Sequence, residues 1–236
     1  MLSDDECKQQ LADKTDALLH AVTHSAQQLS KMLSQQLAAH TTDESLPQKI
    51  RESQLRKLLF PSIESVLTGS RHCFGAGFAS HHYSTDHQQP YWFLEWWFKN
   101  PKNQQASCLE LDQATQQRLD FSTFDWFKHR PEEQNVNLHG PYVDYICTSA
   151  YTLTASSPVM IDGVLAGVAV VDILVSVVEE ELLSLIRQCR ERVVIINPEG
   201  RVMVSSHPGF RTGALVARVP EKEVISKPFF RLFVPE

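Results

Sequence analysis

A tyrosine and two aspartates near the middle of the chain have the residue types and spacing to hold a cation. Tyr142 and Asp144 are two residues apart in GPYVDY, so on an extended chain both side chains face the same side. Asp172 ends the apolar run VLAGVAVVDI, where an unmatched carboxylate costs several kcal/mol, roughly the price of desolvating it. We therefore expect Asp172 to face a positive or hydrogen-bonding group.

Four further residues could complete such a site. Trp126, preceded by Asp125, belongs to an insert that we expect to cover the sheet. Trp92 and Trp96 share one face of the strand YWFLEWWFKNP, and Glu95 takes the other face. Each aromatic face attracts an ammonium group by ~0.5–2 kcal/mol. Together with the three residues above, these four form the predicted ligand-binding set.

The same residues also have a structural interpretation. Asp144 could cap a turn, and Asp172 could be the N-cap of a helix that starts near Val175. The tryptophans would then be core residues. The sequence leaves both interpretations open.

Other chemistry has weaker support. The polar loop HHYSTDHQQP holds His81, His82 and His87, whose metal binding we consider the lesser alternative to simple solvation. His207 follows Ser206 but has no third partner for a catalytic triad. The chain lacks HExxH, GxSxG, GxGxxG and P-loop motifs. We expect no catalytic residue, no metal and no cofactor.

Composition narrows the class of protein. The chain has 236 residues and a formal net charge of −6, which argues against nucleic acid as a direct partner. The N-terminal residues are polar, and no apolar run approaches the ~20 residues that span a bilayer, so we expect a cytoplasmic protein and no membrane partner. Five cysteines without CxxC spacing predict free thiols rather than disulfides or zinc. They are Cys7, Cys73, Cys108, Cys147 and Cys189.

Two long helices are predicted in the N-terminal part of the chain. Residues 4–40 carry a stripe at alternating spacings of four and three, which could pack on the same chain or on the helix of a second copy, so a homodimer is allowed. The stripe consists of Leu11, Thr15, Leu18, Val22, Ser25, Leu29 and Met32. A second helix is expected over 48–69.

Strands follow from His72 onward. CFGAGFAS is a strand whose glycines mark the close approach of a backbone or ligand. Asp162-Gly163 and Asn197-Pro198-Glu199-Gly200 predict hairpin turns, and 175–192 an amphipathic helix. The order predicts an α+β fold: long helices packed on an antiparallel sheet with helical inserts. We divide it into a helical region (1–70), a ligand-binding module (71–175) and a C-terminal helix, hairpin and tail (176–236).

The order GPYVD, SPV, a D-G turn, Gly167-Val168 and Asp172 resembles a Cache domain, a PAS-like sensor. In Cache sensors of amino acids, a tyrosine and two aspartates hold the ligand ammonium, and Tyr142, Asp144 and Asp172 match them. The resemblance places an arginine two residues before Trp126 to clamp the ligand carboxylate, but here that residue is Phe124. It therefore implies a ligand with an ammonium and no free carboxylate, such as a polyamine or biogenic amine.

Most Cache domains lie between two spanning helices, and the sequence shows neither, so we expect a free-standing sensor. With no output domain recognised, we expect it to signal to a separate partner, such as a transcription regulator or an amine-pathway enzyme. One alternative is an enzyme with Asp144 or Asp172 as general base. Another is a dimerisation or adaptor module that acts through the helix at 4–40.

Overall fold

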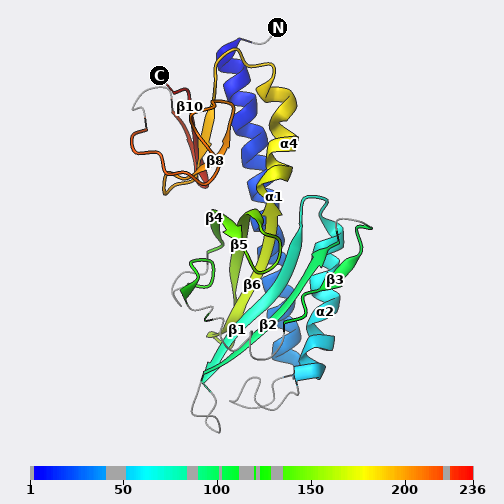
Figure 1. The fold of residues 1–236 in the computed structure, drawn as a ribbon. Coiled ribbons are helices and arrows are strands. Elements are labelled where there is room, and N and C mark those ends of the chain that lie inside the picture. Colours follow the sequence, from blue (N-terminus) through cyan, green and yellow to red (C-terminus); the bar gives the residue numbers. More distant parts are fainter. Residues whose placement is uncertain are drawn as a thin grey trace. The chain divides into compact units, whose positions relative to one another are not determined.

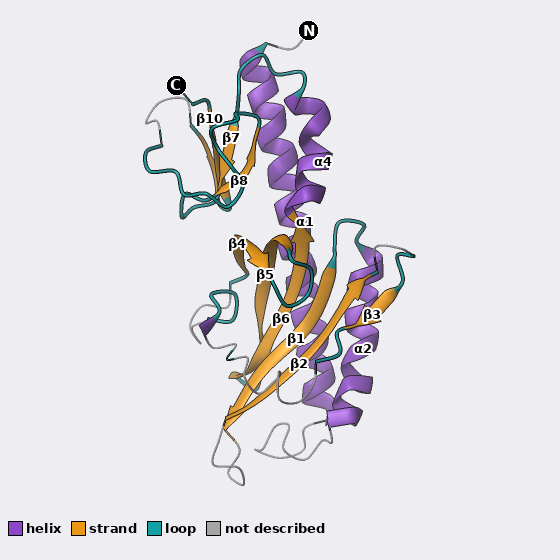
Figure 2. Ribbon diagram, in the orientation of Figure 1, coloured by secondary structure: helices purple, strands orange, loops and turns teal. Residues whose placement is uncertain are grey.

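The computed structural model describes residues 3–40, 52–83, 90–100, 103–111, 120, 123–128, 135–219 and 224–235. Figure 1 traces the element order and Figure 2 separates helices from strands. The helices are α1 (Asp4–His40), α2 (Glu52–Gly69) and α4 (Val175–Ile186). The strands are β1 (Gly75–Tyr83), β2 (Pro90–Lys99), β3 (Ala106–Cys108), β4 (Asn137–Asp144), β5 (Ala150–Ile161), β6 (Val164–Leu174), β7 (Val194–Ile196), β8 (Val202–Ser205), β9 (Ile225–Lys227) and β10 (Phe230–Phe233).

These strands form two sheets. The larger has six strands in the order β3-β2-β1-β6-β5-β4, and β1 pairs antiparallel with both β2 and β6. The smaller has four, in the order β8-β7-β10-β9. Helix α2 packs beside β1 and β2 (Figure 1). The predicted α+β class, with long N-terminal helices and a PAS-like antiparallel sheet, is confirmed.

The chain divides into two compact units. The sheet unit comprises Val22–His139 and Thr154–Asp172. The terminal unit comprises Met1–Ala21, Gly140–Leu153 and Ile173–Glu236. The three consecutive segments expected from the sequence (1–70, 71–175 and 176–236) stay a prediction.

Helix α1 starts with a capping box. The Ser3 hydroxyl accepts the Glu6 backbone N–H at 3.3 Å, and the Glu6 carboxylate accepts the Ser3 N–H at 2.8 Å. Six of the seven stripe residues are buried, and Met32 is half-buried. Thr15, one of the two polar members of the stripe, donates to the Leu11 carbonyl at 2.7 Å. The stripe is therefore used within this chain, and a homodimer stays a prediction.

Both predicted hairpin turns are present. Asp162 and Gly163 have φ values of 49° and 79°, the left-handed conformation that a D-G turn supplies. Gly200 donates its N–H to the Asn197 carbonyl at 3.0 Å, closing the turn between β7 and β8.

Two element boundaries differ from the prediction. Strand β1 continues to Tyr83, because its hairpin with β2 keeps pairing through the polar residues that were assigned to a loop. Helix α4 ends at Ile186 rather than at residue 192, since the N–H groups of Gln188 and Cys189 both turn back to the Leu185 carbonyl. No structure was predicted for the tail, which forms β9 and β10.

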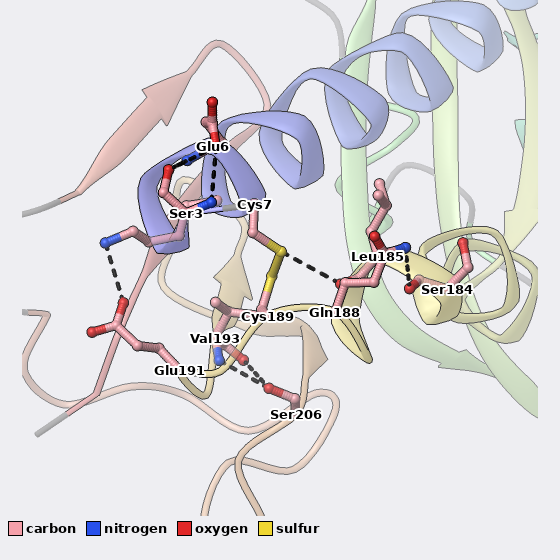
Figure 3. Close-up of a disulfide and its surroundings, with 11 residues drawn as sticks. Ser3, Glu6, Cys7, Ser184, Leu185, Gln188, Cys189, Glu191, Val193 and Ser206 are labelled. Atoms are coloured by element: carbon pink, nitrogen blue, oxygen red, sulfur yellow. Dashed lines mark hydrogen bonds and ion pairs between the residues drawn. A yellow bond between two sulfur atoms is a disulfide. The ribbon is translucent and has the colours of Figure 1, made fainter. Parts of the chain in front are cut away.

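The expectation that all five cysteines are free thiols is wrong. Cys7 at the start of α1 and Cys189 after α4 form a disulfide with a Cα–Cα distance of 5.7 Å (Figure 3). The pair is 182 residues apart, so sequence spacing could not reveal it. Lys8 binds Glu191 at 3.2 Å and strengthens the same junction. Free thiols remain at Cys73, Cys108 and Cys147.

Candidate ligand-binding site

A row of side chains crosses four strands on one face of the sheet unit. Asp172 on β6 is the cross-strand partner of Gly75 on β1, and Gly77 is the partner of Trp96 on β2. Cross-strand partners share a face of the sheet. From β5, the Thr154 hydroxyl donates to Asp172 Oδ1 at 2.6 Å. We call Trp96, Gly75, Gly77, Asp172 and Thr154 the Asp172 row.

The two glycines of the row make space for the indole of Trp96. A Cβ atom on Gly75 would lie 2.5 Å from Trp96 Cζ2, and one on Gly77 would lie 2.6 Å from Trp96 Cε3. Both distances are shorter than real Cβ contacts, so the ring lies flat along β1 only because these positions are glycine. The close approach that the sequence predicted at CFGAGFAS is thus made by a side chain of β2.

The row is buried. Asp172 is 2% exposed, Thr154 1% and Trp96 5%. Among the described residues, Trp96 Nε1 has no hydrogen-bond partner although it is shielded from solvent. Charges and dipoles in such surroundings interact more strongly than in water.

Cys73 lies beside the row as a neutral thiol. Its S–H donates to the Gly75 carbonyl at 3.3 Å. Burial raises the pKa of the Cys73 thiol to about 12; the charge of Lys99 lowers this pKa, and the negative charge of Asp172, a smaller effect, raises it. Because the thiolate is the nucleophilic form, Cys73 is not an activated nucleophile at neutral pH.

Asp172 is not the helix cap that the structural interpretation required. The N-cap of α4 is Leu174, with φ −73° and ψ 138° and no side-chain capping bond. Asp172 instead lies inside β6, where its main-chain carbonyl accepts the Phe74 N–H at 2.8 Å. The Asp172 side chain therefore does not cap α4 but lies on the face of the sheet, where it accepts the hydrogen bond from Thr154.

Asp144 does cap a turn, as the structural interpretation expected. Its Oδ1 accepts the backbone N–H groups of Ile146 at 3.0 Å and Cys147 at 3.2 Å. Tyr142 is half-buried on the same strand, β4. Both residues belong to the terminal unit. A ligand-binding role for Tyr142 and Asp144 stays a prediction.

The residues predicted around Trp126 form a turn. Asp125 is exposed and binds Lys128 at 2.8 Å, a hydrogen bond that lowers the pKa of Asp125. Trp126 is half-buried, with its ring 5.6 Å from that of Phe124 and 6.0 Å from that of Phe127. Asp125 is thus engaged at the surface, while Trp126 belongs to an aromatic cluster.

For some predicted positions the structure does not describe the side chain. Trp92 lies on β2, and His81 and His82 lie on β1, but their side chains are not among those described. His87 lies outside the described residues altogether. Within the described part of the chain, no cluster of three or more metal-ligating side chains occurs.

Sequence reasoning missed an ion pair on the opposite face of β2. Glu95 is 1% exposed and pairs with Arg56 of α2, while Trp97 Nε1 donates to Glu95 Oε1 at 2.7 Å. Arg56 also lies 5.1 Å from the centre of the Phe93 ring. A glutamate among strand aromatics was the available signal, since a buried carboxylate needs a partner.

A pocket of about 300 Å³ opens next to this ion pair. Its lining combines a guanidinium, a carboxylate, a thiol and leucines, from Arg56, Leu94, Cys108, Leu109, Glu110 and Leu111. Burial raises the pKa of the Cys108 thiol, so this thiol is also held in its neutral form near pH 7.

No protein-family model matches the chain, and no curated protein matches its sequence. Solved structures do match. The ligand-binding domain of the Pseudomonas aeruginosa PAO1 amino acid chemoreceptor PctC, in complex with GABA, superposes with a TM-score of 0.57 at 16% identity. The match covers 96% of this chain and 94% of that one.

Two further structures share the fold. The periplasmic sensory domain of the Campylobacter jejuni chemoreceptor Tlp1 matches with a TM-score of 0.61 at 10% identity, over 86% of this chain and 70% of that one. The extracellular domain of the histidine kinase soHK1S-Z6 matches with a TM-score of 0.58 at 15% identity, over 84% and 68%. The fold is therefore that of Cache-like sensory domains.

The predicted cytoplasmic location is wrong. The structures that share this fold are periplasmic or extracellular domains. The Cys7–Cys189 disulfide agrees with them, because disulfides persist mainly in oxidising compartments. The prediction failed because it rested on two absences in the sequence, that of an apolar N-terminal segment and that of a membrane-spanning run. Within the described part of the chain, no helix is both long and apolar enough to cross a membrane.

Proposed function

We propose that this chain is the ligand-binding part of a sensor, and that its ligand is an organic amine bound at the Asp172 row. One observation carries the proposal: a buried carboxylate, a hydroxyl and an indole lie on one face of adjacent strands. The fold supports it, since the structures that share this fold are sensory domains.

Charge and hydrogen bonding favour an ammonium group at this place. A carboxylate offers about four acceptor positions and an ammonium three donors. In surroundings that exclude water, their attraction is stronger than at a surface. The Trp96 ring, held over Gly75 and Gly77, adds an aromatic wall to which a cation is attracted.

The proposed selectivity rests on Phe124, which stands where the resemblance to Cache sensors of amino acids places an arginine. A phenyl ring cannot form the bidentate hydrogen bonds through which an arginine binds a carboxylate. Phe124 packs against Trp126 instead. We therefore propose polyamines or biogenic amines as ligands in preference to amino acids.

The output of the sensor is proposed to be read by a partner protein. The domains that share the fold come from a histidine kinase and from chemoreceptors. A transcription regulator or an amine-pathway enzyme as the partner stays a prediction from the sequence. A ligand can shift the output only if it binds the two signalling states with different affinity.

Replacing Asp172 by asparagine tests the proposal. Asp172→Asn keeps an oxygen that can accept the Thr154 hydroxyl but removes the charge, so we expect a folded protein that no longer binds amines. The assay is thermal unfolding with putrescine, ethanolamine, alanine and acetate, followed by titration calorimetry. A ligand at 100 times its Kd stabilises the native protein by ~2.7 kcal/mol.

The control is Asp162→Asn, which alters an exposed carboxylate at a turn that asparagine also favours. We expect it to bind amines as the wild type does. Amine binding that survives in Asp172→Asn, or a wild type that responds only to acetate or to nothing, would contradict the proposed site.

A further inference from the structure

We infer that Trp96 Nε1–H is a ligand-binding donor, and that the ligand carries a neutral oxygen acceptor on the carbon next to its amine-bearing carbon. This inference rests on the proposed amine function. It goes further, because it assigns a second recognition point and a narrower class of ligand.

The buried indole N–H is the first observation. Trp96 is 5% exposed, and its Nε1 has no hydrogen-bond partner among the described residues. Buried polar groups in native proteins almost always have a partner, and one left without a partner calls for an explanation such as a ligand. The N–H of Trp97, one residue along, is already satisfied by Glu95.

The second observation is that the indole packs closely against the backbone of β1. A Cβ on Gly75 would be 2.5 Å from Cζ2 and 3.3 Å from Nε1, so the N–H edge of the ring lies directly over Gly75. The other end of the ring lies over Gly77. A donor held in place in this way loses little conformational entropy when it binds.

The third observation gives the spacing between the two recognition points. Asp172 is the cross-strand partner of Gly75, and partners have Cβ positions about 4.5–5.5 Å apart. The indole N–H and the carboxylate therefore flank a single glycine. We infer that a ligand which reaches both groups is short, with about two bonds between its ammonium carbon and its acceptor oxygen. This spacing describes a 2-aminoalcohol or an α-amino carbonyl compound.

The chemistry of the donor sets the selectivity. A ligand with a methyl group in place of the oxygen would leave the indole N–H unpaired in a dry site. Sites that are built to bind a hydroxyl discriminate strongly against analogues that lack it. We expect a preference of about tenfold or more.

Ethanolamine and propylamine make the matched pair, since they differ by a hydroxyl in place of a methyl group. Titration calorimetry with the full chain should show ethanolamine binding about tenfold tighter or more. Replacing Trp96 by 3-benzothienylalanine exchanges N–H for sulfur at nearly constant shape. We expect this variant to bind the two amines equally, with the affinity for propylamine unchanged. The same replacement at Trp97, whose N–H serves Glu95, should leave the preference intact.

Indole ¹H–¹⁵N resonances give a readout that needs no variant. Ethanolamine should move the Trp96 N–H signal downfield, and propylamine should not. If both amines bind the wild type equally and the signal stays in place, the inference is overturned while the amine function stands. If neither amine binds, the proposed function fails and the inference fails with it.

Discussion

Gly75 is the residue at which the two halves of the proposed site meet. Trp96 lies over it from β2, and Asp172 faces it from β6. Gly75 has an ordinary strand conformation and pairs with strands on both sides. A glycine is therefore needed here for its lack of a side chain, and not for its conformational freedom. Its lack of a side chain leaves room for the indole next to the residue that pairs with Asp172.

Gly75→Ala should therefore displace Trp96. The new methyl group would lie 2.5 Å from the ring, so we expect a loss of about 1–3 kcal/mol in the free energy of unfolding, together with weaker amine binding. Urea unfolding and calorimetry measure the two effects. Gly69→Ala is the control, since nothing lies within 4 Å of its added Cβ and its stability should not fall. Equal behaviour of the two variants would refute the steric argument.

Strand β2 has two different faces. Trp96 belongs to the face of the Asp172 row, whereas Glu95 and Trp97 point to the side of α2. Alternation along the strand puts Trp96, which we propose to bind the ligand, next to a structural ion pair. The Arg56–Glu95 pair ties α2 to β2 and so holds the strand that carries Trp96.

Arg56→Met should leave Glu95 as a buried carboxylate without its cation. We expect a loss of about 3 kcal/mol or more in the free energy of unfolding, measured in urea. The double variant Arg56→Met, Glu95→Gln should recover much of this loss, because the uncompensated charge is gone. A double variant no more stable than Arg56→Met would show that the pair matters for packing rather than for charge.

Local patterns predicted much of the fold but only part of the site. The stripe of α1, the D-G turn before β6 and the two faces of β2 all follow from periodicity and turn chemistry. The position of Trp96 over Gly75 does not, because it depends on the register between β1 and β2. The Arg56–Glu95 pair was missed for the same reason, since its partners come from separate elements.

At the scale of the whole molecule, the fold has little sequence in common with the domains that share it. Identities of 10–16% accompany TM-scores of 0.57–0.61. What the chains share is therefore the fold rather than the sequence. The chemistry of each site has to be argued from its own residues.

Removing the disulfide should weaken the terminal unit. Cys189→Ser, or reduction of the wild type, should cost about 2–5 kcal/mol, because a long closed loop restricts the unfolded chain. Hydrogen exchange in α4 is the preferred measurement, since a chain with two units need not unfold in one step. Cys147→Ser, which alters a free thiol, should leave this exchange unchanged. Similar protection in oxidised and reduced protein would count against a stabilising role.

Every residue of the Asp172 row lies between Cys7 and Cys189 in the sequence. A protease that cuts once anywhere in this interval, for example between α1 and α2, leaves two polypeptides joined by a covalent bond. Such a nicked protein should run as one species on a non-reducing gel and as two after reduction. Cleavage would then interrupt the chain without separating its pieces.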